Sequence, residues 1–320
     1  MRSATPAPGG GRVARRVPVA VRARGGVLAL ALTGVLWGSL GIAVRMLQDS
    51  GLSPAVIAFW RMVCACLVLA PLIGARGLRD LRAAARRPRR LLAVSLGSLA
   101  FQLLYFLAVR DVGVAVATLV TLGLAPVAVL VHEAVEERRV PGPRTLAVLA
   151  CALTGLALVV SASGGDAVTA PDPLRGLAEA AASGLAYAAT TVVSGPLSAR
   201  LGAFRIIAAT SAVAVVLLLP AALVAGPGIP LTPRVVGGLA WLGVVTTVVA
   251  YGLFYAGLRT TPGSVAMVLT LLEPATAVVL AALLLDEPLT PRGGAGAALL
   301  LLAVAVLYLA APRREPAVQR

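Results

Sequence analysis

Short motifs in the first half of this 320-residue chain return about 150 residues later. The paired segments are residues 34–37 (GVLW) and 184–187 (GLAY), residues 108–110 (AVR) and 257–259 (GLR), and Glu137 with Pro141 and Glu287 with Pro291. Self-similarity at a fixed period indicates an internal duplication. Each copy is predicted to contain five membrane-spanning helices. Because five is odd, the second copy is expected to run through the membrane in the opposite direction to the first.

The composition is that of a membrane protein. Apolar residues make up 59% of the chain and charged residues only 13%, which leaves too little polar surface for a soluble domain of this length. A net charge of +15 could indicate nucleic-acid binding, but the 28 basic residues, all arginine, mostly fall in short loops between apolar stretches and in the N-terminal tail. That distribution is typical of membrane orientation and argues against nucleic-acid binding.

Taking about 20 apolar residues as one crossing, we predict an all-α membrane protein of ten transmembrane helices in two inverted five-helix repeats. The predicted helices are residues 25–46, 53–73, 90–109, 114–132, 145–163, 175–195, 204–224, 235–257, 264–285 and 293–311. The predicted domains are a basic cytoplasmic tail at 1–24, a first repeat at 25–163, a second repeat at 174–311 and a cytoplasmic tail at 312–320.

Arginine also predicts the orientation. If the N-terminus is cytoplasmic, 22 arginines fall on the cytoplasmic side and five on the other, with Arg61 inside a span. This bias predicts a multi-pass protein of the cytoplasmic membrane with both termini in the cytoplasm. The apolar run 26–47 is too long for the hydrophobic region of a secretory signal, so we interpret it as a retained first helix.

Several short motifs occur in a fixed order along the predicted helices. They are Trp37-Gly38-Ser39 with Ala43 and Arg45 in the first helix, Ser53-Pro54 with Arg61 in the second, Glu273-Pro274 in the ninth, and the acidic-then-proline segments 137–141 and 287–291. On the duplicated plan, this set resembles the EamA-type family of the drug/metabolite transporter superfamily, whose members have ten helices in two inverted halves. The resemblance covers residues 25–311. The first copy departs from it, because Ala125-Pro126 stands where the second copy has Glu273-Pro274.

The resemblance implies a secondary active transporter that moves a small metabolite, an amino acid-like compound or a drug across the cytoplasmic membrane by alternating access. Export is favoured over import. The expected partners are the small-molecule substrate and membrane lipid. Protons are a candidate coupling ion because of the position of Glu273, and association into a homodimer stays open. No cofactor is expected.

Glu273 is the main candidate for a coupling residue. It lies nine residues into its predicted helix, about 14 Å from the cytoplasmic end and so close to the bilayer midplane. An ionised side chain there costs several kcal/mol unless it is paired, hydrated or protonated. Pro274 has no N–H and therefore frees the carbonyl of Thr270. Two interpretations stay open: Glu273 takes up protons or recognises a cation, or it makes a structural hydrogen bond to a neighbouring helix.

Arg61 is predicted to lie about 12 Å from the outer end of the second helix, at a depth similar to that of Glu273. It could pair with Glu273, contact a substrate carboxylate, or extend to the surface beside Trp60. Packing or pairing is the preferred interpretation, because an arginine cannot be deprotonated to serve as a proton relay.

Polar and aromatic side chains recur on one face of several predicted helices, at spacings of three or four residues. Together with Glu273 and Arg61, the candidates for substrate binding or coupling are Trp37, Gln102, Tyr105, Glu179, Tyr187, Tyr251, Tyr255 and Thr270. Such stripes are expected around a shared central cavity. The alternative is hydrogen bonding between packed helices, which is common in membrane bundles.

An enzyme is not expected. The sequence has no glycine-rich phosphate loop, no paired intramembrane aspartates and no cluster with metal-ligand spacing, and its single histidine, His132, is predicted at a cytoplasmic helix end. Two other classes stay open as alternatives. An intramembrane enzyme would need a catalytic pair at one depth, and a membrane sensor or scaffold would have no transport activity.

Overall fold

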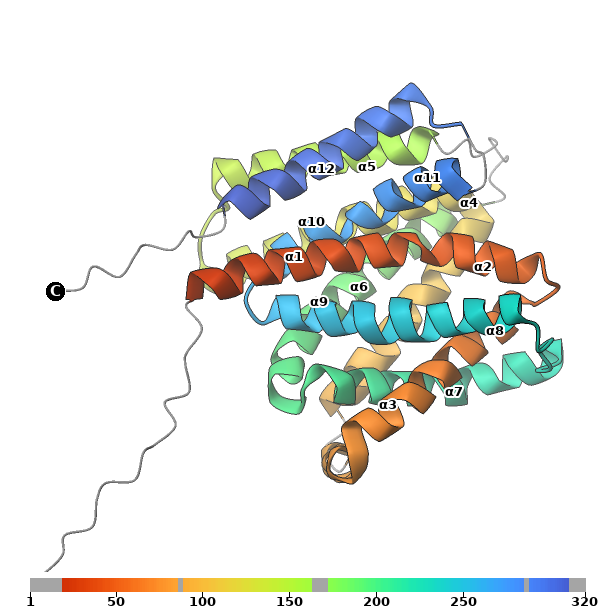
Figure 1. Cartoon of the computed structure of the whole chain (residues 1–320). Helices are drawn as coiled ribbons and strands as arrows, with labels where there is room; N and C mark the ends of the chain where they lie inside the picture. Colours follow the sequence, from red (N-terminus) through yellow and green to blue (C-terminus); the bar gives the residue numbers. More distant parts are fainter. Residues whose placement is uncertain (1–18, 86–88, 163–171, 285–287, 311–320) are drawn as a thin grey trace, which may run out of the picture.

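The computed structural model describes residues 19–85, 89–162, 172–284 and 288–310, and within these ranges every regular element is a helix (Figure 1). The predicted tails at 1–24 and 312–320 lie largely or wholly outside the described residues, as does Glu287. The helices are α1 (Val19–Gly38), α2 (Leu40–Gln48), α3 (Pro54–Ala85), α4 (Arg89–Glu137), α5 (Pro143–Ala162), α6 (Pro173–Leu201), α7 (Ala203–Ala225), α8 (Pro233–Ala240), the π-helix η1 (Trp241–Val249), α9 (Ala250–Leu258), α10 (Gly263–Thr270), α11 (Leu272–Leu284) and α12 (Pro291–Ala310).

Within the described ranges, eight helical segments are long and apolar enough to cross a membrane. Three of them join consecutive helices: α1 with α2, α8 through η1 to α9, and α10 with α11. The 49-residue α4 counts as one of the eight. Helix α6 has 29 residues but is not among them, because its sequence is rich in Ala, Ser, Thr and Gly and carries charges near both ends.

Helix α4 bends back on itself at Gly113. This glycine has φ 80° and ψ 162°, a conformation that residues with a Cβ rarely adopt. The Tyr105 and Thr118 hydroxyls are 2.7 Å apart, although 13 residues of straight helix would separate their backbones by about 20 Å. Ala108 and Ala117 also share one small apolar cluster. Residues 89–112 and 114–137 therefore form two helices side by side, and the bend lies between the predicted helices 90–109 and 114–132.

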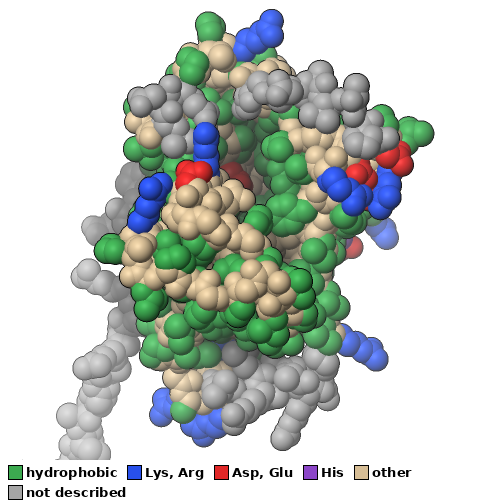
Figure 2. Space-filling model, turned by 90° about the vertical axis from the view of Figure 1, so that its right-hand side faces the viewer, with side chains coloured by type: hydrophobic (Ala, Val, Ile, Leu, Met, Phe, Trp, Pro, Cys, Tyr) green, Lys and Arg blue, Asp and Glu red, His purple; other side chains and the backbone are tan. Residues whose placement is uncertain are grey.

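The helices lie roughly along one direction (Figure 1). Helices α5 and α12 pack together at one edge, α3 packs against α7 at the opposite edge, and α1 lies between them beside α9. We call the end at which α1 begins and α12 ends the tail-side end. Figure 2 looks onto the other end and shows a surface dominated by hydrophobic side chains, with charged side chains in a few groups and a recess between apolar walls.

Contacts between the two copies come in matching pairs. The Thr33 hydroxyl is shared between the Ala29 carbonyl of its own helix at 2.9 Å and the carbonyl of Ala250 in the other copy at 3.2 Å, and the Ser183 hydroxyl donates to the carbonyl of Phe101 at 2.8 Å. Thr33 and Ser183 are about 150 residues apart, as are Phe101 and Ala250. In each copy, therefore, a hydroxyl donates to a backbone carbonyl of the other copy, and the donors and the acceptors occupy equivalent positions.

Two glycines in the first helices of the copies repeat this exchange. A Cβ at Gly34 in α1 would lie 3.0 Å from the carbonyl oxygen of Leu269 and 3.2 Å from that of Thr270. A Cβ at Gly184 in α6 would lie 2.7 Å from the carbonyl oxygen of Thr121. The missing side chains let the first helix of each copy approach the backbone of the fourth helix of the other copy closely.

Candidate functional site

A cavity of about 520 Å³ lies between helices of both copies, within the usual size range of small-molecule sites. Its lining residues are Trp37, Gly38, Leu40, Gly41, Arg61, Phe101, Gln102, Tyr105, Phe106, Val114, Ala115, Thr118, Leu122, Val159, Val160, Tyr187, Thr246, Tyr251, Glu273, Pro274, Ala277 and Val278. Seven of the ten residues predicted from the sequence are among them: Trp37, Arg61, Gln102, Tyr105, Tyr187, Tyr251 and Glu273.

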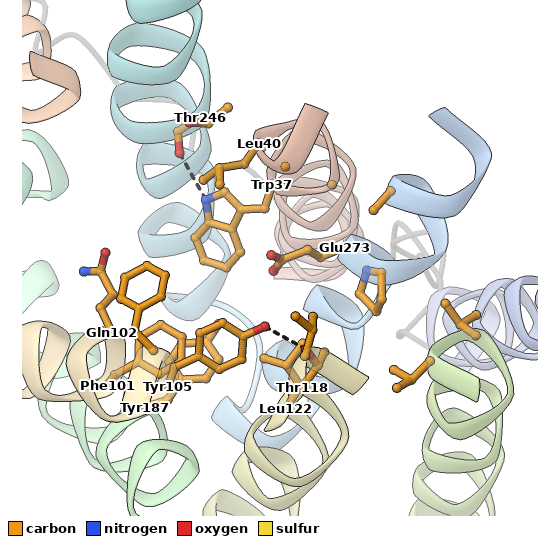
Figure 3. Close-up of a pocket in the computed structure, with 18 of the residues that line it drawn as sticks. Trp37, Leu40, Phe101, Gln102, Tyr105, Thr118, Leu122, Tyr187, Thr246 and Glu273 are labelled. Carbon is orange, nitrogen blue, oxygen red and sulfur yellow. Dashed lines mark hydrogen bonds between the residues drawn. The ribbon is translucent and has the colours of Figure 1, made fainter. Parts of the chain in front are cut away.

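The Glu273 carboxylate is held at a break in its helix. Helix α10 ends at Thr270 and α11 begins at Leu272, and Pro274 leaves the Thr270 carbonyl without the N–H that would bond it in a continuous helix. Figure 3 shows the carboxylate pointing into the space bordered by Trp37 and Tyr105. Among the described residues, no hydrogen bond or ion pair engages it. The carboxylate is therefore free to meet a proton or a ligand in the cavity.

Close packing of α1 places this break. A Cβ at Gly38 would lie 2.7 Å from the carbonyl oxygen of Glu273 and 2.5 Å from the Cβ of Thr276, so the α1 backbone rests directly on the first turn of α11. Gly38 and Glu273 both line the cavity. The position of the acid therefore depends on the absence of a side chain at Gly38.

Aromatic rings form one wall of the cavity (Figure 3). The Trp37 indole donates to the carbonyl of Thr246 at 3.1 Å and packs against Tyr251, with 4.9 Å between ring centroids. Phe101 and Tyr187 stack at 4.8 Å. Thr246 belongs to η1, where the hydroxyls of Thr246 and Thr247 both bond the carbonyl of Leu242 at 2.8 Å. A π-helical segment is frequent at functional sites, and here it supplies the carbonyl that fixes the indole.

Arg61 and Gln102 lie together on another part of the lining. Arg61 Nη2 donates to Gln102 Oε1 at 3.4 Å, and Gln102 Nε2 donates to the Ser98 carbonyl at 3.3 Å. The Nε of Arg61 is buried without a hydrogen-bond partner. Among the described residues, no ion pair joins Arg61 to Glu273. The cavity thus presents the Glu273 carboxyl group and the Arg61 guanidinium, which are not in direct contact with each other.

The structure places three predicted residues away from the lining. Thr270 is buried and donates to the Met267 carbonyl at 2.8 Å, inside the helix that ends there. Tyr255 lies behind the wall, 6.2 Å from the Tyr251 ring, with 4% of its surface exposed. Glu179 accepts a hydrogen bond from Arg175 at 3.0 Å, close to the start of α6. Sharing a helix face with cavity residues is not sufficient, because depth and neighbouring helices decide which members of a stripe reach the cavity.

Sequence reasoning missed Phe101, Thr118 and Thr246 as lining residues. Only the bend at Gly113 brings Thr118 opposite Tyr105. Thr246 contributes to the site through its backbone carbonyl, which accepts the Trp37 hydrogen bond, and side-chain patterns do not reveal this. Glu133, which the sequence places next to His132 at a predicted helix end, was also missed. It is bound to the other copy: Oε1 accepts from the Ser264 backbone N–H at 3.1 Å, and Oε2 accepts from the Ser264 hydroxyl.

The Glu133 contact joins the two copies at the tail-side end of the bundle. Its carboxylate caps the first turn of α10, where unpaired backbone N–H groups and the helix dipole favour a negative charge. Beneath it, Val129 of α4 and Ala266 and Met267 of α10 belong to one buried apolar cluster. The cavity lining instead includes Gly41 in α2 and Val278 in α11, both toward the other end. The cavity is therefore sealed more heavily toward the tail-side end.

The Tyr105–Thr118 hydrogen bond is expected to steady the α4 bend. We predict that Tyr105→Phe lowers the free energy of unfolding by about 1 kcal/mol, because one part-buried hydrogen bond is lost while the ring remains. Thr118→Val should have a similar effect, and the double variant should cost little more than either single one. Thermal unfolding of the purified variants in detergent measures this. Fully additive losses would contradict a direct bond between the two hydroxyls.

The chain is similar to known proteins in sequence and in fold. Residues 24–161 and 174–309 each match the EamA-like transporter family. The chain is 30% identical over 215 residues to uncharacterized transporter YwfM of Bacillus subtilis (strain 168), covering 67% of this chain and 71% of that protein. It is 25% identical over 298 residues to uncharacterized inner membrane transporter YicL of Salmonella typhimurium (strain LT2), covering 92% and 98%. One crystal structure aligns with a TM-score of 0.74 at 20% identity over 89% of this chain and 97% of that one, a likeness of fold.

Proposed function

The chain belongs to the EamA-like transporter family and is a multi-pass membrane transporter rather than an enzyme, and from this premise we propose how it works. It is a secondary active transporter of the cytoplasmic membrane. Two inverted five-helix halves, residues 25–163 and 174–311, enclose the central cavity and expose it alternately to the two sides. The single observation that carries this proposal is the Glu273 carboxylate, which has no hydrogen-bond or ion-pair partner among the described residues and lies in a cavity that both halves line.

Ten crossings follow if α4 is counted as two spans and α6 as one. The bend at Gly113 and the Tyr105–Thr118 contact support two spans within the 49 residues of α4. Helix α6 would extend about 43 Å, more than the hydrocarbon thickness of a bilayer, and its small residues suit packing inside a bundle rather than contact with lipid. Ten is even, so both termini would lie on one side, which the arginine distribution assigns to the cytoplasm.

The matching contacts support a two-fold relation between the halves. Thr33 bonds the second half as Ser183 bonds the first, and Gly34 and Gly184 meet equivalent backbone segments. With five spans in each half, such a relation places its axis in the plane of the membrane. Alternating access then amounts to exchanging which end of the bundle is closed.

Substrate chemistry follows from the lining. Aromatic and aliphatic side chains make up most of the walls, while Glu273, Arg61 and Gln102 supply a few polar anchors. This suits a small metabolite, amino acid-like compound or drug that has an apolar portion and at least one charged or hydrogen-bonding group. Glu273 would either bind and release the coupling proton or recognise a cation, and export is the proposed direction.

The proposal is tested by comparing cells that carry no copy of the gene, the wild-type protein or Glu273→Gln. Extracellular and intracellular small molecules are measured by untargeted mass spectrometry. At least one compound is expected to rise outside and fall inside cells with the wild-type protein, and to return toward the gene-free pattern with Glu273→Gln at equal protein level. Indistinguishable metabolite profiles in wild-type and gene-free cells would argue against export.

Loss of the Glu133 contact is expected to loosen the tail-side closure. In a background lacking Cys64, Cys66 and Cys151, a cysteine at buried Met267 should react slowly with a membrane-impermeant thiol reagent. Glu133→Ala should raise that rate by roughly tenfold, because removing a carboxylate that satisfies buried donors costs about 1–3 kcal/mol. Glu137→Ala is the matched control, an exposed acid one turn away. Equal acceleration by both substitutions would show that Glu133 does not hold this end closed.

A further inference from the structure

A second, smaller cavity lies at the tail-side end, apart from the central one. It has a volume of about 140 Å³ and is lined by residues of α4 and α5 from the first copy and of α10 and α12 from the second. It shares no lining residue with the central cavity. Ser264, whose backbone and hydroxyl both bond Glu133, forms part of its wall. A ligand in this groove would therefore touch both halves directly behind the Glu133–Ser264 contact.

The chemistry of the groove is apolar with one cation. Val148, Leu149, Val265 and Leu307 belong to its walls, and Arg144 is the only charged side chain among the described residues that line it. Arg144 is exposed at the start of α5, and among the described residues it forms no ion pair. The volume of the groove is below the several hundred Å³ typical of sites that enclose a whole small molecule. An apolar slot with an unpaired guanidinium at its mouth suits part of a hydrocarbon chain that ends in an anionic head.

Charge and location identify the source of such a ligand. Arg138 and Arg139 lie exposed shortly before Arg144, which gives this segment three arginines within seven residues. The arginine distribution assigns it to the cytoplasmic leaflet, where anionic phospholipids are attracted by basic residues, and basic pockets between membrane helices on that side bind lipid head groups. Arginine also matches a phosphate with two parallel hydrogen bonds.

We propose that this groove binds one anionic phospholipid. The phosphate lies against Arg144, and an acyl chain follows Val148, Leu149, Val265 and Leu307 between the two halves. The bound lipid braces α5 and α10 beside Ser264 and favours the conformation in which the tail-side end is closed. This inference needs the chain to lie in a membrane, but it does not depend on what the central cavity transports.

Native mass spectrometry of the full-length protein tests the proposal. The protein is released from detergent micelles containing equal amounts of phosphatidylglycerol and phosphatidylcholine with the same acyl chains. We expect one phosphatidylglycerol to be retained in preference to phosphatidylcholine. Arg144→Gln should lower that retention at least fivefold, whereas Arg79→Gln, which removes an exposed arginine of α3 from the same predicted side, should leave it unchanged.

A second variant separates the groove from general surface charge. Val265→Trp fills the slot without changing the charge, so phosphatidylglycerol retention should fall as in Arg144→Gln, while circular dichroism confirms an unchanged helix content. Equal retention of the two lipids, or equal losses for Arg144→Gln and Arg79→Gln, would reduce the effect to non-specific surface lipid and overturn the proposal. Competition by soluble glycerophosphoglycerol as strong as that by the intact lipid would overturn the acyl-chain assignment.

Discussion

Glu273→Gln is expected to abolish the dependence of transport on a pH difference while leaving the protein folded. Glutamine keeps the size and hydrogen-bonding shape of the side chain but cannot take up or release a proton. If Glu273 carries the coupling proton, accumulation driven by a pH gradient in proteoliposomes should fall by more than about tenfold, equivalent to about 1.4 kcal/mol. The measurement is the initial rate of transport of a compound identified in cells, at several imposed pH differences.

Glu179→Gln is the matched control for this experiment. Glu179 is also an acid within the helical bundle, but it bonds Arg175 and does not line the cavity. Its replacement should leave the response to a pH difference intact. A response in Glu273→Gln equal to that of the wild-type protein would contradict a coupling role for Glu273 and leave the carboxylate with a structural or substrate-binding one.

Gly38→Ala is expected to have the second-largest effect, on stability and on the site together. The added Cβ would lie 2.7 Å from the Glu273 carbonyl oxygen, a backbone atom that cannot move aside without shifting the first turn of α11. Overpacking of this kind costs about 1–3 kcal/mol. The midpoint of thermal unfolding in detergent should fall, and transport should fall with it because the carboxylate is displaced.

Gly41→Ala provides the comparison. Gly41 lies in the same candidate membrane span as Gly38 and lines the same cavity, but a Cβ at Gly41 would have no atom within 4 Å. Alanine is a better helix former than glycine by about 1 kcal/mol, so this variant should be as stable as the wild-type protein or slightly more stable. Similar losses of stability in the two variants would argue that the close approach at Gly38 does not position the α11 break.

Local chain chemistry accounts for what could be predicted from the sequence. Apolar length marks most of the spans, and Pro274 lies next to the break between α10 and α11. The spacing of aromatic and polar residues identified seven residues that line one cavity. The Gly113 bend falls in the polar segment between two predicted helices. These features depend on neighbours within a few residues, which the sequence records directly.

Features set by packing between distant helices could not be read in this way. Glu133 and Ser264 are separated by 131 residues, and nothing local to either indicates the other. Tyr255 has the same helical periodicity as Tyr251, yet it is covered by neighbouring side chains instead of facing the cavity. Glu179 lies near the start of α6, where Arg175 is within reach. Depth along the bundle and rotation of each helix decide these cases.

The copies differ where the proposed function needs them to differ. Thr121 donates to the Ala180 carbonyl in the other copy at 3.0 Å, whereas its counterpart Thr270 donates within its own helix to Met267 at 2.8 Å. The break before Pro274 separates the two arrangements, and Glu273 stands beside it without an acidic counterpart in α4. The duplication thus supplies two packed halves. Only the second half carries the acid, because Ala125 stands in the first half where the second half has Glu273.

Blocking the cavity tests the proposed route of transport most directly. In a cysteine-free background, Gly41→Cys places a thiol where a side chain meets open space in the lining. The rate of exchange of a transported compound in proteoliposomes is measured before and after reaction with a bulky thiol reagent. We predict that exchange is normal before the reaction and lost after it, while the cysteine-free protein is unaffected. Undiminished exchange through a fully labelled Gly41→Cys protein would contradict transport through this cavity.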